Sequence, residues 1–205
     1  DDFAVVAGVD IVKSECRAYN TYEKIFDVPV DADVVVDFSN GACLESILEY
    51  GVQKNIPLVL CSTGYTSQQI EKIKLTSSMI PIFYSRNVSL GINVLIEVVK
   101  VATKILKDHA DVCIIEKHHA TKQDKPSGTA LMLTDAIRKF GKNDVDVHSV
   151  RAGTIAGYHD VIFACDDEVL TFSHIAASKE IFANGALDAA RFIIEQSEGL
   201  YDKIY

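Results

Sequence analysis

Residues 33–61 read DVVVDFSNGACLESILEYGVQKNIPLVLC, and this stretch decides the fold class. The apolar run Val34-Val35-Val36 indicates a buried strand. Residues 42–53 carry apolar side chains at helical spacing, and residues 57–61 form a second apolar run. Because short buried strands separated by helices build parallel sheets that are covered on both faces, the stretch predicts an α/β fold.

The same alternation extends on either side of this stretch. Upstream, Phe3–Val9 is a strand-forming apolar run that ends at Asp10. Downstream, Ser67 is a plausible N-cap for a helix that reaches about Lys74, and residues 80–84 predict a further strand. The first half of the chain is therefore expected to form a parallel sheet with right-handed crossovers.

The second half of the chain has a different rhythm. A long helix is expected over residues 92–106, a strand over 110–116 and a helix over 128–140. Three strand-like runs with few helical residues between them come next: 145–150, 159–164 and 169–175. A last helix, over residues 178–196, has an apolar stripe. The pattern favours an α+β segment with a mixed or antiparallel sheet, beginning near residues 87–90.

The composition excludes several classes of function. The formal net charge of −9 disfavours nucleic acid as a partner, although a small anionic substrate stays possible. No run of 18 apolar residues occurs, and the N-terminus is not a signal peptide, so we expect no membrane partner. The cysteine count is odd and no C-x-x-C pair occurs, which favours free thiols in the cytoplasm. These cysteines are Cys16, Cys43, Cys61, Cys113 and Cys165.

The chemistry is concentrated in residues 116–129, which read EKHHATKQDKPSGT. This segment joins a strand to a helix, which is where open α/β proteins place ligands. It holds two histidines and three lysines in an otherwise acidic chain, and it ends in Pro-Ser-Gly-Thr at a helix start. The free backbone N–H groups and the dipole of a helix start suit a carboxylate or phosphate.

This arrangement favours protonation of a small carboxylate substrate, because histidine titrates near neutral pH and a nearby lysine holds an anion. One alternative is a solvated basic loop with capping residues. Another is a metal site, but His118 and His119 are adjacent, and adjacent side chains of an extended backbone point to opposite faces. We therefore expect no metal site. Ser-His hydrolysis is disfavoured because no G-x-S-x-G motif is present.

Three weaker signals lie outside this segment. Asp10 ends the first expected strand, where an acidic residue can accept hydrogen bonds from the ribose of NAD. The small residues Ser62-Thr63-Gly64 follow the third expected strand and suit a turn beside a nicotinamide. Asn87 lies in a polar stretch at the expected domain boundary. Asp10 alone is a weak signal, because aspartates often end strands, and the small residues can form a simple turn. The stretch around Asn87 is polar enough to form a hinge or the wall of a cleft.

At these residues the sequence resembles the dihydrodipicolinate reductase family of bacterial lysine biosynthesis, also called 4-hydroxy-tetrahydrodipicolinate reductases. Residues 116–130 match the family signature E-x-H-H-x-x-K-x-D-x-P-S-G-T-A at every fixed position. Shorter stretches agree in order along nearly the whole chain: Asp37-Phe38-Ser39, Ser62-Thr63-Gly64-Tyr65, Asn87-Val88-Ser89, Arg151-Ala152-Gly153 and Phe182-Ala183-Asn184-Gly185-Ala186-Leu187.

The resemblance implies the reduction of 4-hydroxy-tetrahydrodipicolinate, a small cyclic dicarboxylate, to tetrahydrodipicolinate by hydride transfer from NADH or NADPH. It implies that His118 is the catalytic acid and Lys122 its partner on the substrate. The implied substrate contacts are His119, Lys122, Gly128 and Thr129. The implied cofactor contacts are Asp10 at the adenosine ribose, Ser62, Thr63 and Gly64 at the nicotinamide, and Asn87 near the cleft.

The resemblance also implies a domain organisation. Residues 1–89 and 180–205 are expected to form a Rossmann-like dinucleotide-binding domain, without the first strand and glycine-rich loop with which the family opens. Residues 90–179 are expected to form an α+β domain for substrate binding and assembly into a homotetramer. The preference between NADH and NADPH stays open, because Asp10 repels a 2′-phosphate and Lys13 attracts one.

Two other functions remain as alternatives. A non-catalytic dinucleotide-binding protein on the same scaffold is compatible with the missing glycine-rich loop. A different dehydrogenase, such as one that acts on an amino acid, is compatible with the fold class. The complete set of His118, Lys122, Gly128 and Thr129 favours the reductase, because a protein that only binds has no need of an acid.

Overall fold

The computed structural model describes residues 3–12 and 18–203, and the chain divides into two compact units. Unit 1 comprises Asp1–Ser85 and Ala186–Tyr205, and unit 2 comprises Arg86–Gly185. The expected domain boundaries, 89/90 and 179/180, lie near these divisions. Each unit has its own sheet and its own apolar core, so each is described by itself below.

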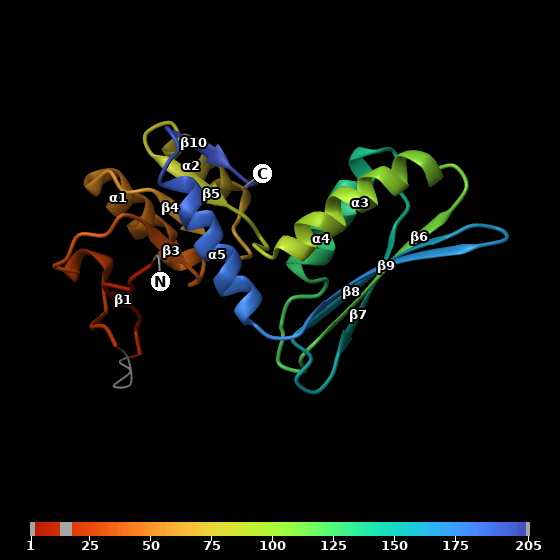
Figure 1. The fold of residues 1–205 in the computed structure, drawn as a ribbon, viewed down its shortest axis with the longest axis horizontal. Helices are drawn as coiled ribbons and strands as arrows, with labels where there is room; N and C mark the ends of the chain where they lie inside the picture. Colours follow the sequence, from red (N-terminus) through yellow and green to blue (C-terminus); the bar gives the residue numbers. More distant parts are fainter. Residues whose placement is uncertain (1–2, 13–17, 204–205) are drawn as a thin grey trace. The chain divides into compact units, whose positions relative to one another are not determined.

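Unit 1 is built on a four-stranded sheet of order β10-β5-β4-β3 in which every neighbouring pair is parallel (Figure 1). Its strands are β3 (Val35–Asp37), β4 (Leu58–Leu60), β5 (Pro81–Tyr84) and β10 (Gly199–Tyr201). The parallel sheet expected for the first half of the chain is confirmed. Strand β10 was not expected from the sequence, and it brings the C-terminal segment beside β5.

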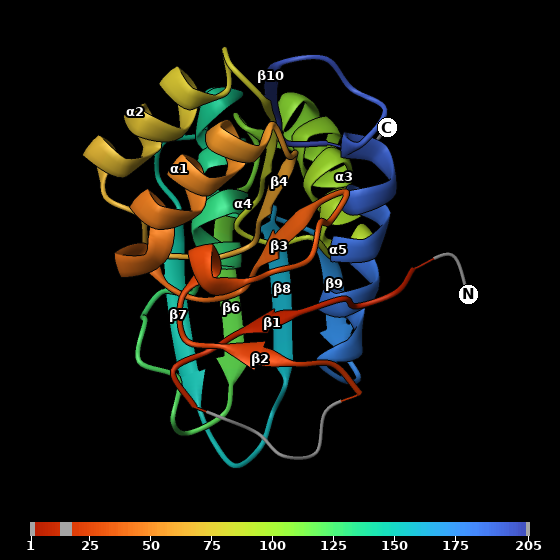
Figure 2. The same cartoon turned by 90° about the vertical axis from the view of Figure 1, so that its left-hand side faces the viewer.

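Helices cover both faces of this sheet, as Figure 2 shows. On one face lie α1 (Leu44–Lys54), which follows the short 3-10 helix η2 (Gly41–Cys43), and α2 (Ser67–Thr76). Leu58 and Leu60 of β4 share one buried cluster with residues of both helices. On the other face, the ring of Phe83 meets the edge of Phe192 from α5 (Glu180–Ile193), with the ring centroids 6.5 Å apart. Such double coverage explains why the strands are continuously apolar.

Two details near the N-terminal part of unit 1 differ from the sequence-based expectation. The strand expected over Phe3–Val9 is shorter: β1 (Gly8–Val9) pairs only with β2 (Thr21–Tyr22), in a separate two-stranded parallel sheet. The backbone N–H groups of Gly8 and Asp10 donate to the carbonyls of Asn20 and Tyr22. Strand formation requires such a partner as well as apolar side chains. A 3-10 helix, η1 (Ile25–Asp27), follows β2.

The N-cap of α2 is also shifted by one residue. Thr66, and not Ser67, caps the helix: its hydroxyl accepts a hydrogen bond from the backbone N–H of Gln69. The Gln69 side chain returns a contact to the backbone of Thr66, which completes a capping box. The reciprocal bond satisfies two helix-end N–H groups at once, which Ser67 alone would not do.

Unit 2 is a four-stranded mixed sheet of order β7-β6-β8-β9, which confirms the α+β expectation. Strands β6 and β7 are parallel, whereas the β6–β8 and β8–β9 pairs are antiparallel. Its elements are α3 (Leu90–Leu106), β6 (Asp111–His118), α4 (Gly128–Lys139), β7 (Asp146–Arg151), β8 (Gly157–Ala164) and β9 (Val169–Ala176). Figure 1 shows that α3 and α4 lie over one face of this sheet.

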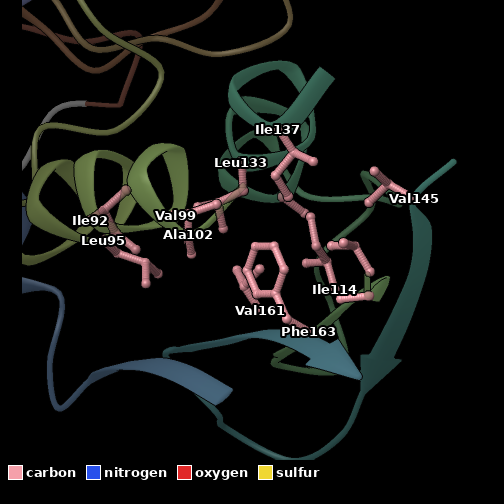
Figure 3. Packing of buried hydrophobic residues seen from close by; sticks show 13 residues of the cluster. Ile92, Leu95, Val99, Ala102, Ile114, Leu133, Ile137, Val145, Val161 and Phe163 are labelled. Carbon is pink, nitrogen blue, oxygen red and sulfur yellow. The ribbon is translucent and has the colours of Figure 1, made fainter. Parts of the chain in front are cut away.

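The core of unit 2 fills the space between these helices and the sheet (Figure 3). Val99 of α3 and Leu133 of α4 pack above Ile114 of β6 and Phe163 of β8, and none of the four is exposed to solvent. Each such side chain contributes about 1.5–3 kcal/mol by its burial. This packing fixes the end of β6 and the start of α4, which flank the loop within residues 116–129.

None of the helices within residues 3–12 and 18–203 has the length and apolar character that a membrane span requires. Four cysteines are free thiols, namely Cys43, Cys61, Cys113 and Cys165. Cys61 is buried, as expected for a core residue, and burial together with the charge of Asp37 raises its pKa to about 12. Cys16 lies outside the described residues.

Candidate active site

Glu116, the first residue of the 116–129 segment, has a carboxylate with no solvent exposure. The polar contacts of the site are arranged around it. Glu116 and His118 lie two residues apart on β6, so their side chains point to the same face of the sheet. In the sheet register Glu116 stands between Ser149 of β7 and His159 of β8, and His118 stands opposite Arg151. The sheet therefore gathers residues that are far apart in the sequence.

Four donors surround the two oxygens of Glu116. Arg151 forms a two-pronged ion pair, with Nη1–Oε2 at 2.8 Å and Nη2–Oε1 at 2.7 Å. The Nδ1 atom of His118 lies 2.5 Å from Oε2, and the backbone N–H of Ser127 donates to Oε1 at 3.3 Å. Such a planar arginine fork holds a carboxylate in one orientation.

These contacts determine which groups carry charge. Burial by itself raises the pKa of Glu116, but hydrogen bonds from Arg151, Ser149 and His118 outweigh it and lower the pKa to about 2. Glu116 is therefore an anion at neutral pH. Burial lowers the pKa of His118, against the opposing effect of Glu116 and with further lowering by the charges of Lys122 and Arg151. His118 is consequently poised to release a proton.

The loop after β6 brings Lys122 near His118. Lys122 forms an ion pair of 2.8 Å with Asp124, and its backbone N–H bonds to the carbonyl of His119. Arg151 donates to the carbonyl of Asp124 at 2.6 Å, so the same arginine that holds Glu116 also holds this loop. The ring of His119 lies 2.7 Å from the hydroxyl of Thr121, apart from the contacts of His118.

The start of α4 is shaped as an anion site. Ser127 is the N-cap and accepts a hydrogen bond from the backbone N–H of Ala130. Gly128 and Thr129 are the first helical residues, and their N–H groups belong to the end of a helix where backbone donors lack helical partners. The side-chain amide of Asn87 donates to the Thr129 hydroxyl at 2.7 Å, so Asn87 supports this helix start within unit 2.

His159, which fits the family pattern G-x-H together with Gly157 but was given no role from the sequence, also belongs to this site. It is buried, its Nε2 lies 3.1 Å from the Ser127 hydroxyl, and its ring centroid lies 5.1 Å from that of His118. Burial, followed by the positive charge of a protonated His118, lowers its pKa to about 3. The signal for it was the alternation of β8, which places His159 on the buried face.

The low pKa of His159 predicts a pH-dependent stability. The folded state keeps this imidazole neutral, whereas the unfolded chain protonates it below a pKa of about 6.5. Stability is therefore lost as the pH falls from about 6.5 towards 3, by up to about 1.4 kcal/mol for each pH unit. Urea unfolding at pH 7 and pH 5 should show a smaller loss for His159→Gln than for the wild type. Parallel losses in the two proteins would contradict this assignment.

In unit 1, another carboxylate organises the loops at the carboxyl end of the parallel sheet. Asp37, which ends β3, accepts hydrogen bonds from the backbone N–H of Ser39 at 2.8 Å, the Ser62 hydroxyl at 2.8 Å and the Tyr65 hydroxyl at 2.9 Å. It therefore ties the loop after β3 to the loop after β4. In the second loop Thr63 and Gly64 are exposed, and Gly64 has φ 80° with no heavy atom near the place of a Cβ.

Asp10 follows β1, at a strand end as expected, but in the separate two-stranded sheet. Its carboxylate accepts a hydrogen bond from the backbone N–H of Val12 at 3.0 Å. Lys13, which bears on the choice between NADH and NADPH, lies outside the described residues. The sequence-based cofactor residues Asp10, Ser62, Thr63 and Gly64 thus belong to unit 1, whereas Asn87 belongs to unit 2.

Comparison with known proteins settles the family. Residues 2–88 match the N-terminal domain of dihydrodipicolinate reductase and residues 91–204 match its C-terminal domain. The chain belongs to the dihydrodipicolinate reductase family. The 4-hydroxy-tetrahydrodipicolinate reductase of Clostridium novyi is 40% identical over 98% of this chain and 86% of its own length. That of Caldanaerobacter subterraneus is 43% identical over the same shares.

Solved structures show that the fold of this family member is also that of known reductases. A dipicolinate-bound dihydrodipicolinate reductase from Paenisporosarcina superposes with a TM-score of 0.76 and 19% identity, covering 97% of this chain and 87% of that one. An aspartate dehydrogenase from Thermotoga maritima gives a TM-score of 0.52 and 17% identity, covering 93% and 87%. Identities this low carry the fold alone, so the fold does not distinguish between these two activities.

Proposed function

We infer that this dihydrodipicolinate reductase family member reduces 4-hydroxy-tetrahydrodipicolinate to tetrahydrodipicolinate with NADH or NADPH, in lysine and diaminopimelate biosynthesis. The observation that carries this inference is the junction of β6 and α4, where His118, Lys122 and the helix start at Gly128 are tied together through Glu116 and Arg151. A proton donor, a cation and an anion site together are what reduction of an anionic ring requires.

The substrate class follows from the polar groups of unit 2. The N–H groups of Gly128 and Thr129 belong to a helix start, which suits a carboxylate. The carboxylate of Asp124 already accepts a hydrogen bond from the backbone of Gly128, so a substrate carboxylate would take its place there. Lys122 supplies a positive charge for a carboxylate, in competition with its present partner Asp124. The family relative from Paenisporosarcina was solved with dipicolinate, an aromatic ring with two carboxylates. We propose that this chain also takes a small cyclic dicarboxylate, and that His119 contacts it.

Several residues of unit 1 fit a nicotinamide dinucleotide. The loop after β4 follows a parallel strand, exposes Thr63 and Gly64, and has open space where Gly64 lacks a side chain. We propose that Ser62, Thr63 and Gly64 lie at the nicotinamide and that the carboxylate of Asp10 binds the adenosine ribose. The cofactor supplies a hydride to the substrate ring.

His118 then supplies the proton. The 4-hydroxyl group leaves as water, and a hydride from the cofactor would add to one carbon of the resulting unsaturated ring. The displaced electron pair would take up a proton from Nε2 of His118, whose Nδ1 is engaged by Glu116. The pKa of His118 is lowered before substrate binds, chiefly by burial. A bound dicarboxylate adds negative charge nearby and raises the pKa of His118. Substrate binding therefore favours the protonated form of His118.

This mechanism predicts different pH limits for two kinetic parameters. The parameter kcat/KM reports the free enzyme and should fall with rising pH at a pH below 6.5, because the His118 pKa is lowered there. The parameter kcat reports the complex with substrate and should fall only at a higher pH. Steady-state rates across the pH range check this. Identical limbs for kcat and kcat/KM would contradict substrate-assisted protonation.

The activity itself is tested with the product of dihydrodipicolinate synthase as substrate and the full-length protein as enzyme. We expect substrate-dependent oxidation of NADH or NADPH, inhibited competitively by pyridine-2,6-dicarboxylate. Assays with each cofactor determine the preference. Cofactor binding without turnover would support a non-catalytic dinucleotide-binding protein, and turnover of an amino acid would support a different dehydrogenase.

We also propose that the protein is a cytoplasmic homotetramer assembled through unit 2. Helix α3 exposes Val94, Val101 and Ile105, and β9 is an edge strand that exposes Leu170. Between them lies a hollow of about 540 Å³ with an almost entirely apolar lining. Exposed apolar faces beside a free strand edge are typical of association surfaces. Sedimentation should find a tetramer for the wild type and smaller species for Val101→Asp; a monomeric wild type would contradict this.

A further inference from the structure

We propose that Glu116, held by Arg151, is the positioning residue that fixes the tautomer of His118 and aligns it with the anion-binding start of α4. This inference deepens the proposed function, on which its kinetic consequence rests. Glu116 does not meet the substrate in this account: it has no solvent exposure and both of its oxygens are already occupied by donors from the protein.

Glu116 determines which ring nitrogen of His118 carries a hydrogen. Glu116 is ionised, because its pKa is lowered to about 2, and an ionised carboxylate only accepts hydrogen bonds. The short contact of 2.5 Å between Oε2 and Nδ1 therefore requires a hydrogen on Nδ1 of His118. When the ring is neutral, Nε2 must carry the lone pair, and when the ring is protonated, Nε2 carries the transferable proton.

The other ring nitrogen of His118, Nε2, lies beside Gly157. A Cβ placed on Gly157 would stand 3.3 Å from Nε2 of His118, which is tighter than an ordinary contact, and 3.6 Å from the adjacent ring carbon Cδ2, which is an ordinary contact. The neighbour on that side is a glycine, so the backbone there leaves room beside Nε2. The ring is thus anchored through Nδ1 and free of side-chain contact from this residue at Nε2.

Arg151 offsets the effect of Glu116 on the pKa of His118. A lone carboxylate beside a histidine raises the pKa of the imidazole, which would make His118 hold its proton more tightly. Here burial is the largest cause of the lowered pKa of His118, and the charge of Arg151, which forms two hydrogen bonds to Glu116, lowers that pKa further against the effect of Glu116. The pair therefore orients the imidazole while leaving the acid ready to release its proton.

Glu116 and Arg151 also bind the loop and the helix start at which we propose that the substrate binds. The oxygen Oε1 accepts the backbone N–H of Ser127, the N-cap that directly precedes Gly128 and Thr129. The guanidinium of Arg151 also binds the carbonyl of Asp124, whose side chain pairs with Lys122. The buried Glu116–Arg151 ion pair thus fixes the positions of His118, Lys122 and the start of α4 relative to one another. Catalytic groups need such fixed positions for a productive geometry.

The tautomer is tested in the wild-type protein, without any variant that must fold. Nitrogen-15 NMR of labelled histidine distinguishes a protonated nitrogen from one with a lone pair. At a pH where His118 is neutral, we expect hydrogen on Nδ1 and a lone pair on Nε2. Hydrogen on Nε2 would overturn the proposal whether or not the protein is a reductase.

Kinetics of Glu116→Gln test the consequence for the reaction. An amide can donate to Nδ1, which reverses the tautomer, so we expect kcat to fall roughly 10²-fold, within the ~10⁴-fold that a reversed tautomer costs in serine proteases. The high-pH limb of kcat should also shift to lower pH, because the charge that supports protonated His118 is lost. Glu168→Gln, at an exposed position in the turn between β8 and β9, is the matched control and should keep the wild-type rate.

The outcomes separate this proposal from the proposed function. An active wild type with an unchanged kcat and an unchanged pH limb in Glu116→Gln overturns the positioning role and leaves the reductase in place. A wild type without reductase activity refutes the proposed function, and the NMR result then decides the tautomer by itself. A folded Glu116→Gln protein is verified by thermal unfolding before its rates are compared.

Discussion

Replacing His118 with alanine is expected to lower turnover by roughly 10²–10⁴-fold, the usual contribution of a general acid. The substituted protein loses the ring of the 116–129 segment that a buried carboxylate anchors at one nitrogen and that has a glycine beside the other. Substrate binding should change less than turnover, because the helix start at Gly128 and the charge of Lys122 remain. Steady-state oxidation of the preferred nicotinamide cofactor measures both parameters.

The matched control for this experiment is His109→Ala. His109 is exposed in the turn after α3, away from the contacts of His118, and its removal should leave turnover unchanged. Added imidazole provides a second check, since it can enter the space left by the ring and restore part of the rate. A His118→Ala enzyme with the wild-type rate would remove this residue from the role of acid.

Replacing Phe163 with alanine should lower the free energy of unfolding by about 3–5 kcal/mol. Phe163 lies on β8, has no solvent exposure, and its ring meets the edge of Phe172 from β9 with the centroids 6.1 Å apart. Its removal leaves a cavity beneath α3 and α4, where the surrounding cluster is close-packed (Figure 3). Urea unfolding measures the loss.

Phe163→Leu is the graded control, because it keeps most of the apolar volume and should cost clearly less than the alanine substitution. The same core supports the end of β6 and the start of α4. The fraction of Phe163→Ala protein that stays folded should therefore also have a lower turnover. A cost below 1 kcal/mol for Phe163→Ala would show that the space under the two helices collapses freely, and that the core does not hold the site rigid.

Much of this arrangement could be predicted from local sequence. Apolar runs of the right length predicted the strands of the two four-stranded sheets except β10, and residues 116–129 identified the strand-to-helix junction with its histidines, lysines and anion site. The mixed sheet of unit 2 followed from three successive strand-like runs. These features depend on neighbours in the sequence, which is why periodicity and a contiguous motif are sufficient to find them.

Other features depend on contacts between distant residues and could not be read locally. The partnership of Glu116 with Arg151 and the position of His159 opposite Glu116 arise from the register of β6 with β7 and β8, which no single segment encodes. Strand β10 has only three residues and exists because β5 offers it an edge. The strand expected from Phe3 shortened to Gly8–Val9 for the converse reason, since its earlier residues pair with no described strand.

The most direct test of the account follows the backbone amides of Gly128 and Thr129 and the ring of His118 by NMR while pyridine-2,6-dicarboxylate is added. We predict that the largest changes occur at these two amides and that the pKa of His118 rises on binding, because a carboxylate binds at the start of α4 beside His118. Binding that leaves both amides and the His118 pKa unchanged would contradict it.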